Sequence, residues 1–496
     1  MPDTCVLAID LGTSGPKVAV IDAAGRTLCW RSRPVATTFL PDGGAEQDPR
    51  QMWSAIVDAT RAALGDLSPV PPISMVAVTS QFMSTVPVAA DGTPTGPCVL
   101  WMDTRGAAHN LSLLTDESFM LFVDRHGLIP LPSGNDNIAH AHVLAEHHPE
   151  AYRAAVALVE PMDYVNARLT GRLCATQSTA FGQLVCDNRT WGATEYDPDL
   201  VTATRLDPDK LAPLVPINGV IGEVTSAAAS ALGIAAGIPV CTGTIDSITS
   251  AVGAGALEQS AGSAIIGTTS VMVTHIGEHR VDLGAGLLAV PSPLAGRYFV
   301  MAENGVGGRA LEWAARLLGY GDDLLAAVSD ATTVPAGADG VRFVPWLLGS
   351  IAPSPNDDVR AAWTGLSLPH DRRHLLRATM EGVALNLAWL LPAVEQFVGT
   401  TWPFLRFGGG GALSDLWAHT LADALGRPVH QLAEPRATNA RGAAFLALAE
   451  LGEISLDDVP DLLEVRAVCD PDPSVRGLMD AALERLVGLH ASFALG

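Results

Sequence analysis

The sequence has few positive charges for its length. Its 496 residues include 30 Lys and Arg against 53 Asp and Glu, which gives a formal net charge of −23 at pH 7. No cluster of basic residues stands out along the chain. Because nucleic acids are bound through basic patches that neutralise their phosphates, a nucleic-acid partner is not expected. Small anions can still bind through backbone amides.

We also expect neither a targeting signal nor a membrane-spanning helix. The opening MPDTCVLAID has neither the basic start nor the long apolar stretch of a secretory signal. No later run reaches the length of about 18 apolar residues that suits a membrane helix. We therefore expect a cytoplasmic protein with no membrane partner.

Cysteine is scattered and unpaired in the sequence. The seven cysteines are odd in number and form no C-x-x-C pair. This pattern argues against both a disulfide framework and a zinc site of the usual spacing. We expect them to be small buried apolar side chains.

The chain does contain enough apolar material for more than one core. Hydrophobic residues make up 48% of it and charged residues 17%, a composition typical of ordered globular proteins. A chain of 496 residues exceeds what one core usually serves, so two or three domains are expected. The apolar, glycine-rich segment that begins near Gly243 marks the best boundary and divides the chain into residues 1–243 and 244–496.

Strands and helices alternate along the chain. CVLAID, KVAVID and TLCWRSRPV read as three strands joined by glycine turns, a helical pattern follows from about Asp48, and ISMVAVTS reads as a buried strand. In the second half, YFVMAENGV is followed by helices at RALEWAARLLG and from Asp371, and the latter is predicted to end at Pro392. The alternation indicates an α/β fold.

One glycine turn occurs twice. GTSGPKVAV begins at Gly12 and GTTSVMVTH at Gly267, and each follows an apolar strand. The two halves begin alike, which predicts duplicated domains. A Gly-Thr-Ser turn after a buried strand presents backbone N–H groups and hydroxyls to phosphate oxygens, so two such turns suit one polyphosphate. Asp10, which ends the strand before the first turn, either caps this turn or holds Mg²⁺ through water.

A second glycine cluster, Gly408 to Gly411, lies between a strand and a helix in FLRFGGGGALSDLWAHTLADALG. Ser414 is the candidate N-cap of that helix. Four successive glycines let a ligand approach the backbone more closely than strand-to-helix packing requires. Neither a P-loop nor a G-x-G-x-x-G unit with a following acid occurs at these turns, which disfavours the common nucleotide-binding folds.

Asp246, in TGTIDSITSAVGAG, is the only charged residue between Glu223 and Glu258. Burial of a carboxylate without a partner is costly. Its position among small, apolar and hydroxyl residues therefore requires an explanation.

Seven segments in this order and spacing resemble the FGGY carbohydrate kinases, members of the actin, hexokinase and Hsp70 superfamily. They are AIDLGTSGPKVAV from Ala8, SQFMSTV from Ser80, WMDTRG from Trp101, MDYVNARLTG from Met162, GTIDS from Gly243, GTTS from Gly267 and GGGGALSDLW from Gly408. The resemblance, which is xylulokinase-like, implies an α/β fold of two duplicated actin-like (ribonuclease H-like) domains with an active-site cleft between them. It implies ATP-dependent, Mg²⁺-requiring phosphorylation of a hydroxyl of a small sugar, ketose or polyol.

The resemblance also implies roles for individual residues. Asp246 matches the general base that takes the proton from the acceptor hydroxyl, and largely uncharged surroundings would leave its carboxylate free to accept that proton. Asp10 would lie near Mg²⁺ and the phosphates. The residues that would bind ATP are Asp10, Gly12, Thr13, Ser14, Lys17, Gly267, Thr268, Thr269, Gly409, Gly410, Gly411, Ala412 and Ser414. Those that would contact the acceptor are Gln81, Phe82, Met83, Asp103, Asp246 and Ser247.

The chain departs from the family pattern on the acceptor side. Phe82 and Met83 follow Gln81, where glycerol kinases have Arg-Glu and xylulokinases Met-His. Ser247 follows the catalytic acid, where many members have Asn or Gln, and the G-E-R-x-P stretch reads GSIAP from Gly349. These departures leave the ATP side intact and leave the identity of the acceptor open, and Phe82 and Met83 either face the acceptor or turn into the core.

Two kinds of acceptor are open from the sequence: a ketopentose such as xylulose or ribulose, and a short polyol such as glycerol or erythritol. A sugar-binding regulator that kept the fold without turnover is the alternative from another class. Asp246 and both phosphate turns favour the enzyme. The sequence also leaves a homodimer open.

Overall fold

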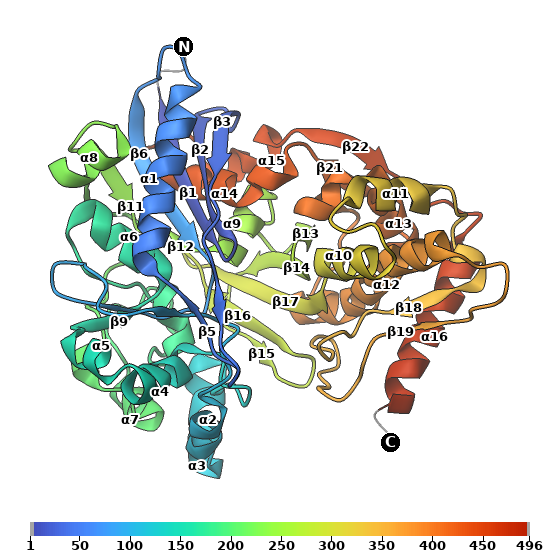
Figure 1. The fold of residues 1–496 in the computed structure, drawn as a ribbon, viewed down its shortest axis with the longest axis horizontal. Coiled ribbons are helices and arrows are strands. Elements are labelled where there is room, and N and C mark those ends of the chain that lie inside the picture. Colours follow the sequence, from blue (N-terminus) through green and yellow to red (C-terminus); the bar gives the residue numbers. More distant parts are fainter. Residues whose placement is uncertain (1–3, 494–496) are drawn as a thin grey trace.

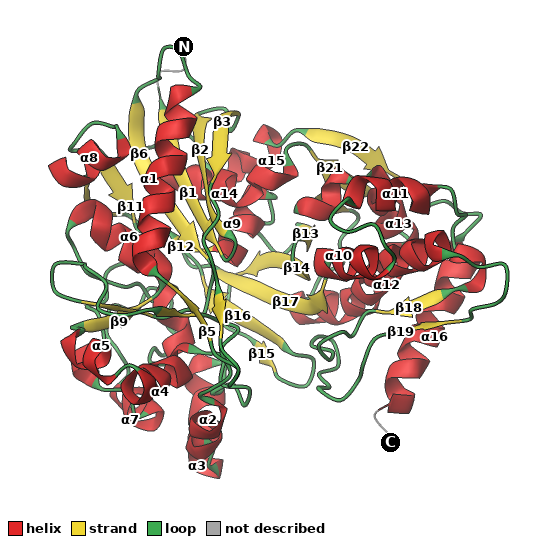
Figure 2. Ribbon diagram, in the orientation of Figure 1, coloured by secondary structure: helices red, strands yellow, loops and turns green. Residues whose placement is uncertain are grey.

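The computed structural model describes residues 4–493 as two lobes, each built around its own β-sheet and covered by helices (Figure 1; Figure 2). Both lobes mix helices with strands, which confirms the predicted α/β class. Within residues 4–493, no helix combines the length and the apolar character needed to cross a membrane.

The first sheet is formed by residues of the first half of the chain. Its strands are β1 (Cys5–Gly12), β2 (Gly15–Asp22), β3 (Thr27–Ser32), β6 (Ile73–Ser80), β10 (Val220–Glu223), β11 (Pro239–Cys241) and β12 (Thr244–Ile245). Their order is β10-β11-β6-β1-β2-β3, and β12 also pairs with β6. β1 is antiparallel to β2 and parallel to β6, so Ala8 lies between Ala19 and Ala77. The first sheet therefore extends two residues past position 243.

The second sheet repeats this arrangement. Its strands are β13 (Gly262–Ile266), β14 (Thr269–Ile276), β15 (Val281–Asp282), β16 (Leu287–Pro291), β17 (Tyr298–Val306), β20 (Leu405–Gly408), β21 (Val429–Leu432) and β22 (Val465–Cys469), in the order β15-β16-β17-β14-β13-β20-β21-β22. β13 is antiparallel to β14 and parallel to β20, as β1 is to β2 and β6. The two glycine turns of the sequence join the paired strands β1–β2 and β13–β14. The predicted duplication is therefore present in the topology.

Helices cover the faces of both sheets. Those of the first half are α1 (Pro49–Gly65), α2 (Ala107–Leu113), α3 (Asp116–Leu121), α4 (Asn137–His147), α5 (Pro149–Ala154), α6 (Pro161–Thr170), α7 (Pro198–Thr204), α8 (Ser226–Leu232) and α9 (Asp246–Gly253). Those of the second half are α10 (Gly308–Leu317), α11 (Leu324–Thr332), α12 (Arg372–Val398), α13 (Asp415–Leu425), α14 (Thr438–Glu450), α15 (Val459–Leu462) and α16 (Arg476–Phe493). Short strands form three further small sheets from β4 (Thr38–Phe39), β5 (Ala45–Gln47), β7 (Val86–Val88), β8 (Cys98–Val99), β9 (Ala157–Val159), β18 (Arg342–Val344) and β19 (Ala362–Thr364).

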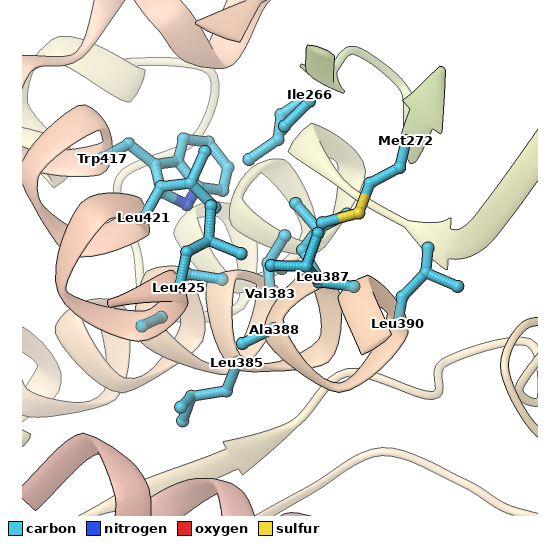
Figure 3. Packing of buried hydrophobic residues seen from close by; sticks show 14 of the residues in the cluster. Ile266, Met272, Val383, Leu385, Leu387, Ala388, Leu390, Trp417, Leu421 and Leu425 are labelled. Carbon is cyan, nitrogen blue, oxygen red and sulfur yellow. The ribbon is translucent and has the colours of Figure 1, made fainter. Parts of the chain in front are cut away.

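The core of the second lobe is formed by α12 and α13 packed against its sheet (Figure 3). Val383 and Leu387 of α12 lie beside Met272 of β14, and Trp417 and Leu421 of α13 complete the cluster. The predicted N-cap of α13 is confirmed, because the backbone N–H of Trp417 donates to the Ser414 hydroxyl at 3.2 Å. The apolar periodicity of the sequence thus located both helices.

The predicted end of α12 at Pro392 is wrong, because the helix continues to Val398. A proline inside a helix costs about 3 kcal/mol through its missing N–H and its ring. Leu390, Leu391 and Val394, on both sides of Pro392, are buried, and burial of each such side chain stabilises by about 1.5–3 kcal/mol. Packing on the second lobe therefore outweighs the local cost.

The two lobes are joined where α9 crosses α14. Although α14 comes from the second half of the chain, it packs against β1 and β6 of the first sheet (Figure 1). A Cβ atom at Gly253 would lie 1.9 Å from the carbonyl oxygen of Thr438, and one at Gly442 would lie 1.9 Å from that of Thr249. The helices therefore touch backbone to backbone, a separation that only glycine permits.

Alanine at this crossing should separate the helices and destabilise the protein. We expect Gly442→Ala and Gly253→Ala to lower the free energy of unfolding by at least about 2 kcal/mol, since the clash is with backbone atoms that cannot rotate away. Urea unfolding followed by circular dichroism measures the change. Gly488→Ala in α16 is the matched control, because its Cβ would meet no atom within 4 Å. A Gly442→Ala variant as stable as this control would contradict the crossing.

Candidate active site

Asp246 lies at the carboxyl ends of the parallel strands of the first sheet. β12 pairs with β6 so that Ile245 lies opposite Ser80, and Asp246 begins α9 directly afterwards. β1 ends at the same edge with Asp10 and the first glycine turn. This edge, where parallel strands finish together, is where open α/β sheets place their ligand sites.

Three charged side chains gather at this edge. Lys17 faces Asp10 across the β1–β2 register, and its Nζ lies 3.3 Å from Asp10 Oδ2. Asp10 is 2% exposed, whereas the Lys17 side chain is 43% exposed. The neighbouring Asp10 carboxylate raises the Lys17 pKa, and Asp246 adds to this effect. The lysine therefore stays charged and offsets part of the negative charge of the two carboxylates.

The electrostatics of Asp246 differ from the sequence-based expectation. Along the chain it has no charged neighbour, but in space Asp10 and Lys17 act on it, so the expected uncharged surroundings are wrong. Burial and the neighbouring Asp10 raise the Asp246 pKa and Lys17 lowers it, which leaves the pKa at about 7. Its Oδ1 lies 3.4 Å from the Ser247 hydroxyl. A carboxyl group with this pKa can exchange a proton near neutral pH.

The first glycine turn is tied to the loop after β6. The hydroxyl of Thr13 donates to Gln81 Oε1 at 2.7 Å and accepts from Trp101 Nε1 at 3.0 Å. Gln47 Nε2 donates to the carbonyl oxygen of Thr13 at 2.7 Å. Gln81 therefore joins the turn of Gly12, Thr13 and Ser14 to the segment that carries Phe82 and Met83. Trp101 opens the WMDTRG segment but was not predicted as a site residue.

The second glycine turn is braced by the start of α10. The backbone N–H of Gly308 donates to the carbonyl oxygen of Gly267 at 2.8 Å, and that of Gly307 to Thr268 at 3.1 Å. A Cβ at Gly267 would come no closer than 4.0 Å to any other atom, so one side of the turn is open. Thr269 begins β14 directly after it.

In the glycine cluster, Gly409 and Gly411 pack closely against Ile266, whereas Gly410 has no neighbour on its open side. A Cβ at Gly409 would lie 2.6 Å from the carbonyl oxygen of Ile266, and one at Gly411 would lie 2.8 Å from the Ile266 side chain. At Gly410 a Cβ would meet nothing within 4 Å. Ala412 is buried and its carbonyl oxygen accepts from Gln431 Nε2 at 2.7 Å. Gly410 alone of these three glycines therefore borders open space.

Phe82 and Met83, which we call the apolar wall, follow Gln81 directly after β6. Both are half-buried against the apolar cluster between the lobes, and the ring of Phe82 lies 6.1 Å from that of Phe181. Met83 has φ +53°, a left-handed conformation that is unusual for a residue with a side chain. Asp246 follows the strand that pairs with β6, so this wall lies next to it.

Asp103 is placed differently from the prediction. Its side chain is fully buried, and both oxygens bond to Arg105, whose NH2 group also contacts Glu46 at 2.7 Å. The backbone N–H of Ala45 occupies Asp103 Oδ2 at 2.9 Å. With no surface left for a ligand, Asp103 does not lie open to an acceptor. It supports the chain around Trp101 instead.

Glu303 on β17 is a carboxylate that sequence reasoning missed. It lies opposite Val271 on the face that carries Phe299 and Met301 toward the first lobe. Its side chain makes no hydrogen bond or ion pair with the described part of the chain, residues 4–493. Burial alone raises its pKa to about 7. No motif in the sequence marks it.

Comparison with known proteins agrees on one family. The description "FGGY family of carbohydrate kinases, N-terminal domain" matches residues 5–253, and the corresponding C-terminal domain matches residues 262–451. A xylulose kinase of Bacillus subtilis is 25% identical over 452 residues, 89% of this chain and 87% of that protein. A glycerol kinase of Alkalilimnicola ehrlichii is 30% identical over 466 residues, 90% of each chain. The crystal structure of xylulose kinase from Rhodospirillum rubrum, 26% identical, matches with a TM-score of 0.84 over 99% of both chains.

The raised pKa of Asp246 predicts a stability cost that grows with pH. Its pKa is about 7 in the folded chain and about 3.9 when unfolded, so stability is greatest below the lower value and falls as pH rises toward the upper one. Asp246→Asn should therefore be more stable than the natural protein, and its advantage should grow by about 1–3 kcal/mol between pH 5 and pH 8.

Urea unfolding at both pH values measures this difference. Asp358→Asn, which changes an exposed carboxylate in a loop, is the control and should show no such growth. An Asp246→Asn advantage that is equal at pH 5 and pH 8 would show that Asp246 is not held in its costly environment.

Proposed function

Because the chain belongs to the FGGY family of carbohydrate kinases, which matches residues 5–253 and 262–451, we propose that it transfers the terminal phosphoryl group of ATP to a small sugar, ketose or polyol. The observation that carries this proposal is the position of Asp246. It lies beside Asp10 and Lys17 at the first glycine turn, and next to the loop of Phe82 and Met83.

The proposal divides the work between the two halves of the chain. Residues 1–243 hold the acceptor and the first phosphate turn, and residues 244–496 hold ATP. Asp246 is the first residue of α9, the helix that crosses α14. The general base therefore stands on the element that joins the two lobes.

Asp246 acts as general base in this proposal. The acceptor hydroxyl gives its proton to the Asp246 carboxylate while its oxygen forms a bond to phosphorus and the bond to the departing ADP oxygen breaks. A pKa of about 7 suits this role, because a substantial fraction of the carboxylate is ionised at neutral pH and is still basic enough to hold the proton. The positive charge of Lys17 lowers the Asp246 pKa and so limits its rise.

The residues of the cleft fit a polyphosphate with its metal ion. The turns at Gly12 and Gly267 and the open side of Gly410 leave room where a Cβ would meet little, which suits the close approach of a nucleotide. Asp10 would hold Mg²⁺ through water, as a hard oxygen ligand. Bound there, the ion would supply positive charge that neutralises the phosphate oxygens.

The acceptor wall favours a molecule with an apolar face. A hydroxyl turned toward Phe82 or Met83 would lose its water without gaining a partner, which costs about 1–3 kcal/mol. A methyl, methylene or C–H face in the same place would lose nothing. Deoxy sugars and unusual polyols therefore belong beside xylulose and ribulose among the candidate acceptors.

A panel of acceptors in a coupled assay of ADP release tests the proposed function. We expect ATP-dependent turnover of at least one uncharged ketose or polyol, with gluconate as the charged comparison. Asp246→Asn should lower kcat by about 10²–10⁴ with the KM for ATP unchanged. Wild-type kcat/KM should rise with pH and level off above about 7, because the base must be ionised. Near-normal turnover by Asp246→Asn would remove Asp246 from this role.

Met83→His should restore a polar partner in the wall. We expect kcat/KM for xylulose to rise against that for the best deoxy acceptor by about 5 to 150-fold. Met120→His, at an exposed position on α3, is the matched control and should change no ratio. If glycerol is the best substrate of the natural protein, or if Met83→His leaves every ratio unchanged, this account of the wall is wrong.

A further inference from the structure

The loop that carries Phe82 and Met83 is held from behind by two buried side chains of other elements. Glu160, which precedes α6, accepts from the backbone N–H of Ser84 at 3.1 Å and also lies at the N–H of Met83. Asn137, the first residue of α4, donates from Nδ2 to the carbonyl oxygen of Ser84 at 3.1 Å and to Thr85 Oγ1 at 2.9 Å. Both side chains are 3% exposed. Glu160 thus contacts the peptide groups on each side of Met83, and Asn137 holds the next residues along, Ser84 and Thr85.

This grip matters because Met83 is in a costly conformation. Its φ of +53° is disfavoured for any residue with a Cβ, so it persists only when the surroundings fix it. Gly182, which has no side chain, leaves room for the side chains of Met83 and Asn137. A Cβ there would lie 1.9 Å from Asn137 Oδ1 and 3.3 Å from Met83 Cγ. Three segments far apart in the sequence therefore converge on one strained residue.

The chemistry of Glu160 fits a neutral carboxylic acid. Its Oε1 is buried and has no hydrogen-bond partner within residues 4–493, and the same is true of Asn137 Oδ1. Burial raises the Glu160 pKa well above its usual range, which favours the neutral acid, while the contacts with Ser84, Asn137 and Met83 lower it.

We propose that Glu160 and Asn137 are positioning residues that hold Met83 in its left-handed conformation and thereby set the selectivity of the kinase among acceptors. The part of this inference that concerns selectivity rests on the proposed function. The same support reaches the rest of the site, because the Ser84 hydroxyl accepts from the backbone N–H of Trp101 at 3.2 Å. Neither residue needs to touch the acceptor for this role.

Substitution of Glu160 tests the selectivity. Glu160→Leu removes the acceptor for the Ser84 N–H, so we expect the KM for the best acceptor to rise about 10-fold or more and acceptor ratios to change, with the KM for ATP unchanged. Glu160→Gln should keep the natural ratios, because its amide oxygen can still accept from the backbone N–H of Ser84. Asn137→Ala should resemble Glu160→Leu. Val383→Ala, in the core of the second lobe, is the control for lost stability and should leave acceptor ratios unchanged.

A double-mutant cycle tests the strain itself, independently of turnover. Glycine adopts φ +53° at no steric cost, so Met83→Gly should change the Tm more favourably in the natural protein, where Glu160 holds the strained conformation, than in Glu160→Leu, where Met83 can relax. If Met83→Gly shifts both backgrounds equally, the grip on Met83 is disproved. If acceptor ratios in Glu160→Leu and Asn137→Ala match those of Val383→Ala, the selectivity role is disproved. If the natural protein turns over no acceptor, the proposed function fails, and the cycle still decides whether Glu160 holds Met83.

Discussion

The backbone contact between α9 and α14 at Gly253 and Gly442 is the constraint on which the rest of the molecule depends. α9 carries Asp246 at its first residue, and α14 lies under β1 and β6, whose ends carry Asp10 and the loop of Met83. Because the helices meet without side chains between them, their separation is fixed by backbone atoms alone. The position of Asp246 relative to β1 and β6 therefore depends on this contact.

Local patterns predicted most of the fold. The strands around Gly12, the helix after Asp48 and the Ser414 cap are encoded within a few residues, through alternation, glycine turns and a hydroxyl at a helix start. The end of α12 was not predictable in this way. Pro392 predicts a stop by its own chemistry, and only the burial of its neighbours on a distant sheet overrides that signal.

The residue types that the sequence marked lie at one edge of the first sheet, but their electrostatics depend on the fold. The first glycine turn, Asp10 and the isolated Asp246 come together there, yet the approach of Asp10 and Lys17 to Asp246 depends on β12 joining the first sheet. Asp103 was assigned to the acceptor from the resemblance, and its burial against Arg105 is visible only in the fold. The supports of Met83 left no trace in sequence, since Asn137 and Glu160 meet it only through tertiary contacts.

The ion pair between Lys17 and Asp10 determines what amine-reactive reagents change in this protein. Apart from its α-amino group, the chain has only two primary amines, those of Lys17 and Lys210. Lys210 contacts the carbonyl oxygen of Ala155 and the ring of Tyr152, whereas the Lys17 side chain is 43% exposed beside Asp10. In most proteins, acylation of lysine changes charges spread over the surface. Here an acyl group on Lys17 would remove the cation beside Asp10, so reagents used for labelling or immobilisation would change the charge at the edge of the first sheet.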